Sequence, residues 1–149
     1  MSDNTVDVDT STPTNALTGL RRGAFIGYHW LLLAFLLLGA VQIFLAGLGV
    51  FNLDGQELGA KGETAFDPHR NLGFAMGGLA LIILVLALIA RPGARAIILS
   101  AGLFLLAFLA QSLLTGLAED SPAFGGLHAL DGLGILAIAG FLYASSRHR

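Results

Sequence analysis

The chain has 149 residues, of which 55% are hydrophobic and 12% are charged, and its mean hydropathy is +0.77. Soluble domains carry about 25% charged residues, so this composition predicts that a lipid bilayer surrounds most of the chain. The net charge of −2 offers no basic surface for nucleic acid, and the absence of cysteine excludes disulfides, iron–sulfur clusters and thiolate metal sites.

The N-terminal segment, residues 1–20, is polar, acidic and rich in Thr and Ser. This composition is typical of a disordered tail. The basic pair Arg21-Arg22 follows the tail and precedes an apolar run that is too long for a cleaved signal. We therefore expect a cytoplasmic tail followed by one transmembrane domain over residues 21–149.

Four apolar segments are each long enough to cross a bilayer, which takes about 20 residues. They cover about residues 24–50, 68–90, 94–117 and 122–144. Because a lipid-embedded backbone must satisfy its own hydrogen bonds, the predicted fold class is all-α, an integral membrane four-helix bundle. Asp67-Pro68 and Ser121-Pro122 each pair a capping side chain with a proline at the first helical position.

The distribution of arginine predicts the orientation of these helices. Six arginines fall on one side of the predicted spans, while the opposite loops are mainly acidic; the six are Arg21, Arg22, Arg91, Arg95, Arg147 and Arg149. Positive charge near the ends of spans favours the cytoplasmic side. We expect a multi-pass protein of the plasma membrane with both termini in the cytoplasm and residues 52–67 outside.

The chain also contains a sparse internal repeat. In "VQIFLAGLGVF" and "AQSLLTGLAED" a Gln is followed five residues later by Gly-Leu, and "HRNLG" and "HALDG" both read His-x-x-x-Gly. The shared residues are Gln42, Gly47, His69 and Gly73 in one half and Gln111, Gly116, His128 and Gly132 in the other. This order predicts two tandem helix pairs, with the second and fourth spans parallel.

His69 and His128 are the leading candidate site residues, because ionisable groups inside a membrane are costly and mark function by default. Two imidazoles on neighbouring helices could hold the iron of haem b or a related haem. Gly73 and Gly132 lie one turn deeper on the same faces, where a flat macrocycle could lie against the backbone. Gln42 or Gln111 could hydrogen-bond the other ring nitrogens, and Arg70 could stay at the interface or pair with a haem propionate.

Simpler interpretations stand beside this one. His69 follows Pro68 near the water interface and could be solvated, and the glycines are also what close helix packing requires. His69 and His128 differ by about 7 Å in distance from their helix starts, so they meet only if the fourth span protrudes further outward. His29 is expected to be interfacial, and Asp131 could orient a histidine or bind a proton.

No enzyme template is present: the chain has no phosphate-binding loop, nucleophile elbow or His-Glu-x-x-His motif, and we assign no catalytic residue.

The quoted motifs resemble one four-helix half of the haem A synthase family over about residues 24–145. That resemblance implies a haem-binding bundle with His69 and His128 as paired ligands. The chain departs from the family in having Phe66 where the family has a glutamate, no cysteine pair and no second half. Oxidation of a haem methyl group is therefore not expected, even where haem binding is retained. The chain is also similar to an uncharacterised group of small bacterial four-helix membrane proteins that share "QIFLAGLGVF"-like and "HRNLG"-like stretches.

The resulting hypothesis is a bis-histidine haem protein for electron transfer or haem handling. Its expected partners are the lipid bilayer, a second copy in a homodimer and a redox partner, with no nucleic acid. Two alternatives remain open: a cofactor-free accessory membrane subunit, and a small proton-coupled transporter that uses Asp131 and the histidines.

Overall fold

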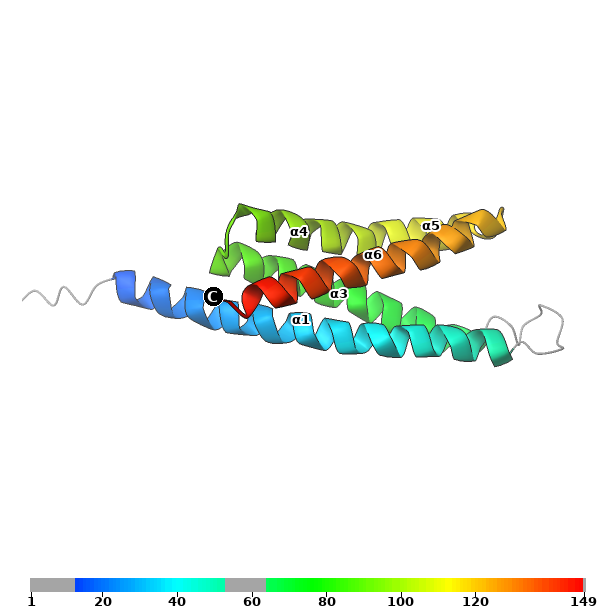
Figure 1. Ribbon diagram of the computed structural model, residues 1–149, viewed down its shortest axis with the longest axis horizontal. Coiled ribbons are helices and arrows are strands. Elements are labelled where there is room, and N and C mark those ends of the chain that lie inside the picture. Colours follow the sequence, from blue (N-terminus) through cyan, green and yellow to red (C-terminus); the bar gives the residue numbers. More distant parts are fainter. Residues whose placement is uncertain (1–12, 53–63, 149) are drawn as a thin grey trace, which may run out of the picture.

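The computed structural model describes residues 13–52 and 64–148, and its regular structure is helical throughout. The elements are α1 (Pro13–Asn52), α3 (Asp67–Ala90), α4 (Ala94–Phe104), the π-helix η1 (Leu105–Ala110), α5 (Gln111–Leu117) and α6 (Pro122–Ser146). Since α4, η1 and α5 follow one another without a break, the described residues form four rods (Figure 1). All four rods are long and apolar enough to cross a membrane.

The first helix is longer than the sequence pattern predicts. It begins at Pro13, so the expected disordered tail is wrong for residues 13–20, and residues 1–12 lie outside the described part of the chain. Proline is favoured in the first turn of a helix, where its missing N–H is not needed. No proline interrupts the chain from there to Asn52, so the helix continues directly into the apolar span.

The other helix boundaries lie close to those expected. α3 and α6 both carry a proline in their first turn, as predicted, but neither Asp67 nor Ser121 makes a capping hydrogen bond. Asp67 is itself the first residue of α3, and Phe66 precedes it. Between α3 and α4, Arg91 adopts the left-handed conformation with φ 54°, and its N–H donates to the carbonyl of Ala87. This αL cap ends α3 and gives the tight turn that "RPG" predicts.

The helices pack as two antiparallel pairs, α1 with α3 and α4–α5 with α6. Each of α1 and α4 lies against both α3 and α6, whereas α3 and α6 are diagonal and make no backbone approach within 8 Å. In Figure 1 the two pairs lie side by side at the end where α1 begins and separate toward the tip formed by α5 and the start of α6. We call these the arginine end, which holds Arg22, Arg91 and Arg147, and the histidine end, which holds His69 and His128.

The buried core occupies only the half of the bundle nearer the arginine end. Its members come from all four rods and are listed here: Tyr28, Leu32, Phe35, Met76, Ala80, Ile83, Ala87, Leu103, Ile135, Ala139 and Leu142. By contrast, η1 and α5 contain no buried residue. The histidine end is therefore held together by something other than an apolar core.

The buried positions of α3 and α6 follow the same spacing. Seven residues after each histidine comes the first buried side chain of this series, and three more follow at intervals of four, three and four residues. The series are Met76, Ala80, Ile83 and Ala87 in α3 and Ile135, Ala139, Leu142 and Ser146 in α6. The two helices thus present equivalent faces to the core, with His69 and His128 at equivalent positions.

Two adjacent isoleucines test the location of this core. Ile83 is 0% exposed and Ile82 is 51% exposed. We expect Ile83→Ala to lower the free energy of unfolding by about 2 kcal/mol or more, because it leaves a cavity. Ile82→Ala should change it by less than about 0.5 kcal/mol. Denaturation in mixed detergent micelles, followed by circular dichroism, measures both, and equal losses would contradict the arrangement.

Candidate cofactor site

The two candidate histidines face each other at the histidine end of the bundle. The centroids of the His69 and His128 rings are 6.2 Å apart, with an angle of 64° between the ring planes. His69 lies in the first turn of α3, and His128 lies almost two turns into α6. The expected difference in depth is absorbed because α6 reaches further outward, together with α5, than the start of α3 (Figure 1).

Gln42 of α1 fixes His69 through both its side chain and its backbone. Its Nε2 donates to the backbone carbonyl of His69 at 2.8 Å and lies 3.4 Å from His69 Nε2. In return, His69 Nδ1 lies 3.1 Å from the carbonyl oxygen of Gln42. A carbonyl oxygen can only accept, so Nδ1 carries the hydrogen and the lone pair of the neutral ring is on Nε2.

Gln111 and Thr115 hold His128 in a closely related way. Gln111 Nε2 donates to the backbone carbonyl of His128 at 3.0 Å, the counterpart of the bond between Gln42 and His69. Thr115 Oγ1 donates to the carbonyl of Gln111 at 2.5 Å and lies 3.4 Å from His128 Nδ1. Since the threonine hydrogen is already used, its oxygen accepts from Nδ1–H, and the lone pair of His128 is again on Nε2.

Thr115 is the site residue that the sequence analysis missed. It lies one helical turn after Gln111, on the same face, and this spacing could have identified Thr115 from the sequence. The equivalent position in the first half is Ala46, which has no hydroxyl group. The histidine of the first half therefore reaches the glutamine carbonyl directly, whereas that of the second half reaches it through a hydroxyl.

Two charged candidates have different surroundings. Asp131 accepts a hydrogen bond from Gln111 Nε2 at 2.9 Å, so this carboxylate is tied to the histidine network through the amide. Arg70 forms an exposed ion pair with Asp67 at 3.4 Å, one turn away on the same helix. Exposed pairs of this kind contribute little stability, so the Arg70 guanidinium can exchange partners.

The glycines one turn after each histidine give access to the glutamines. A Cβ added at Gly73 would lie 3.2 Å from Gln42 Nε2, and one added at Gly132 would lie 3.9 Å from Gln111 Nε2. The absence of a side chain at Gly73 therefore lets the Gln42 amide reach the His69 carbonyl. This differs from the expectation that a flat macrocycle lies against Gly73, since the amide fills that space.

The π-helix η1 places Gln111 on the correct face of its rod. The N–H of Gln111 bonds to the carbonyl of Leu106, five residues earlier. At about 100° per residue, the seven residues from Phe35 to Gln42 complete almost two turns and keep both on one face. Eight residues separate the buried Leu103 from Gln111, and the wider π turn absorbs the extra one. The sequence pattern, read as continuous α-helix, did not predict this turn.

The donor set at this end is incomplete as a metal site made of protein alone. Among the described residues, no group of three or more His, Asp or Glu side chains could hold a metal ion. The two histidines supply two neutral nitrogens, whereas a protein-only zinc site uses three or four ligands. The buried oxygen of the Gln42 amide has no hydrogen-bond partner and lies in the same network.

His29 lies apart from this site, at the arginine end. Its Nδ1 is 2.8 Å from Ser146 Oγ, and its ring stacks on Tyr143 with centroids 4.9 Å apart. These contacts separate His29 from the pair formed by His69 and His128, and its expected place at the membrane interface stays a prediction.

The comparisons with known proteins identify one family. The sequence model of a family of unknown function, DUF6220, matches residues 42–116. The matched segment begins at Gln42, includes His69 and Gly73, and ends at Gly116, before His128. This agrees with the expected similarity to an uncharacterised family and does not link the chain to haem A synthase. No curated protein and no solved structure matches the chain.

Replacing the glycines tests their role beside the glutamines. Alanine in place of glycine stabilises an open helix site by up to about 1 kcal/mol, which we expect for Gly78→Ala, where nothing lies within 4 Å. Gly73→Ala should instead be about 1 kcal/mol less stable than Gly78→Ala, because the new methyl group displaces the Gln42 amide. Gly132→Ala should behave like Gly78→Ala. Thermal unfolding in detergent measures all three, and identical effects at Gly73 and Gly78 would contradict this role.

Proposed function

The chain belongs to DUF6220, a family of unknown function, and we propose that it is a multi-pass membrane protein that binds haem through His69 and His128. The observation that carries the proposal is the tautomer of the His69 and His128 rings, together with the short distance between them. Each Nδ1–H faces an acceptor on the partner helix, which leaves the lone pair on Nε2, and the ring centroids are 6.2 Å apart. The Gln42 amide, 3.4 Å from His69 Nε2, would have to release that nitrogen when the iron binds. Metal–imidazole bonds are about 2 Å long, so one ion could reach both rings.

The surroundings of the rings fit a group that brings its own equatorial ligands. A porphyrin would supply four nitrogens of its own, and His69 and His128 would be the two ligands that the protein adds. The buried apolar side chains stop short of this end. When bound, the haem iron would supply one-electron transfer.

The chain's own residues have distinct tasks in this proposal. His69 and His128 donate Nε2, while Gln42 and Thr115 hold the opposite ring nitrogens and so fix the orientation of the rings. Arg70 is exposed beside His69 and is suited to pair with a propionate. The role is electron transfer or haem handling, in keeping with the resemblance to one half of haem A synthase.

We also propose that the bundle arose from two tandem helix pairs and that both termini lie on the cytoplasmic side of the membrane. The equivalent Gln–His bonds and the equivalent spacing of buried residues in α3 and α6 support two helix-pair repeats. The exposed arginines at one end support placing the termini on the cytoplasmic side of the plasma membrane. A homodimer would restore the eight-helix size of haem A synthase, and a redox partner would be needed for electron transfer.

A second function is favoured by one observation. Asp131 is tied to Gln111, which bonds His128, and the ring of His128 lies against that of His69. This is a run of protonatable and polar groups inside an otherwise apolar bundle. Such runs serve proton movement in membrane transporters, so a haem-free, proton-coupled activity is the alternative.

The absorbance spectrum tests the haem proposal. Protein purified from haem-replete membranes should show a Soret band that shifts and sharpens on reduction. His69→Ala and His128→Ala should each lower the retained haem by more than about tenfold, since even outer-shell changes cost about that much. His29→Ala should retain it, because His29 bonds Ser146 at the other end. A stable, colourless wild-type protein would overturn the proposal.

The proton-coupled alternative makes a different prediction. Haem-free protein in liposomes should move protons along a pH gradient, and Asp131→Asn should abolish that flux because the amide cannot bind and release a proton. Glu119→Gln serves as the control, since Glu119 lies in the turn before α6. Wild-type flux that Asp131→Asn leaves unchanged would exclude a role for Asp131 in proton transfer.

A further inference from the structure

Within residues 13–52 and 64–148, the arginine end carries positive charge without acidic partners. Arg22, Arg91, Arg95 and Arg147 are exposed there, and none makes an ion pair within the part of the chain that the structure describes. The described acidic side chains lie toward the other end: Asp67, Glu119, Asp120 and Asp131. This end is therefore suited to bind an anion that another molecule brings.

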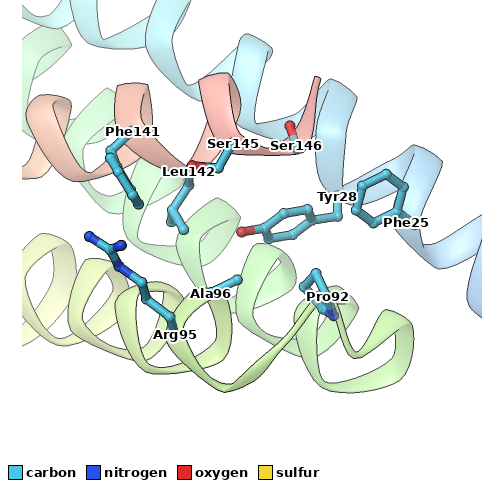
Figure 2. Close-up of a pocket in the computed structure, with 9 residues that line it drawn as sticks. All are labelled: Phe25, Tyr28, Pro92, Arg95, Ala96, Phe141, Leu142, Ser145 and Ser146. Carbon is cyan, nitrogen blue, oxygen red and sulfur yellow. The ribbon is translucent and has the colours of Figure 1, made fainter. Parts of the chain in front are cut away.

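One of these arginines, Arg95, lines a hollow of about 120 Å³. Helices α1, α4 and α6 line it, as Figure 2 shows, with Phe25 and Tyr28 on one side and Phe141 and Leu142 on another. The Arg95 guanidinium is held 4.6 Å from the centre of the Phe141 ring. Cation–π contact of this kind positions the charge at the edge of the hollow without neutralising it.

Ser145 adds a free hydroxyl to the same hollow. Its neighbour Ser146 is already engaged, because its hydroxyl donates to the carbonyl of Tyr143 and lies 2.8 Å from His29 Nδ1. Ser145 makes no such contact among the described residues and lines the hollow beside Phe141 and Leu142 (Figure 2). Arginine and hydroxyl groups both donate hydrogen bonds to phosphate oxygens.

The remaining walls favour a lipid over a free anion. A second, more open hollow adjoins the first, and the two share Phe25 and Ser146. Its lining includes Ile26 and Trp30, and Trp30 is 60% exposed. Tryptophan at this height is typical of the boundary between headgroups and acyl chains. The lining also includes His29 and Arg147, whose polar groups any anion could contact. Only a lipid would in addition cover Phe25, Ile26 and Trp30 with its acyl chains.

We propose that this hollow binds the phosphate of an anionic phospholipid, with Arg95 and Ser145 as its polar contacts. Basic pockets between transmembrane helices on the cytoplasmic side are suited to such headgroups. The site depends on the chain crossing a membrane but not on haem. If the hollow binds no phospholipid, the proposal for His69 and His128 is unaffected. If the protein binds no haem, the proposal for Arg95 and Ser145 is unaffected.

Trp30 is the single tryptophan of the chain and provides the readout. Phosphatidylglycerol with brominated acyl chains, titrated into the full-length protein in neutral detergent, should quench its fluorescence with saturation. Phosphatidylcholine with the same chains should quench weakly. Arg95→Gln should weaken the apparent affinity by about tenfold or more, in line with the loss of a charge-assisted hydrogen bond. Arg95→Lys should recover part of it.

Arg91→Gln is the matched control, because it removes the same charge from an exposed residue outside the hollow. Its effect should be at most about fivefold, as for any charge near the surface. Equal losses for Arg91→Gln and Arg95→Gln would show only diffuse attraction and overturn the proposal. The proposal would also be overturned if millimolar inorganic phosphate prevented the lipid from quenching Trp30, because the site would then bind a soluble anion.

Discussion

The hydrogen bond from a glutamine amide to the backbone carbonyl of a histidine holds the histidine end of this protein together. It occurs twice, from Gln42 to His69 and from Gln111 to His128. The apolar core stops before this end, so polar contacts replace it there. An unpartnered amide in a low-dielectric bundle is costly, and this cost opposes separation of the helices. The same residues hold each ring on its Nδ1 side, and His69 Nε2 also accepts from the Gln42 amide at 3.4 Å, so helix pairing and ring orientation depend on the same contacts.

Different residues fix the rings of His69 and His128, and these differences have chemical consequences. His69 is fixed by a carbonyl, while His128 is fixed through Thr115, and only the second half carries an acid, Asp131, on its glutamine. Outer-shell partners tune the basicity of a ligating imidazole. The two rings would therefore be unequal ligands, and a negative charge near one of them would stabilise an oxidised metal. The π turn before Gln111 accommodates the eight-residue spacing between Leu103 and Gln111.

Much of this arrangement follows from sequence patterns, and the parts that do not have physical reasons. Apolar length predicts all four rods, and His-x-x-x-Gly predicts that the histidines occupy equivalent positions. The start of α1 at Pro13 was missed because a polar composition outweighed the helix-compatible sequence after the proline. The π turn was missed because hydrophobic periodicity assumes a constant 3.6 residues per turn. The meeting of the His69 and His128 rings depends on how far α6 protrudes, and the depth of a helix is set by tertiary packing.

The haem proposal requires that His69 and His128 bind the iron of the same haem. Electron paramagnetic resonance of the oxidised, full-length protein tests it most directly, because the signal reports the number and type of axial ligands on ferric haem. Paired ligation predicts a low-spin, six-coordinate signal with two imidazole ligands. The small amount of haem that remains after either histidine is replaced by alanine should give a high-spin, five-coordinate signal. A high-spin signal in the wild-type protein, or a low-spin signal that survives both replacements, would contradict paired ligation.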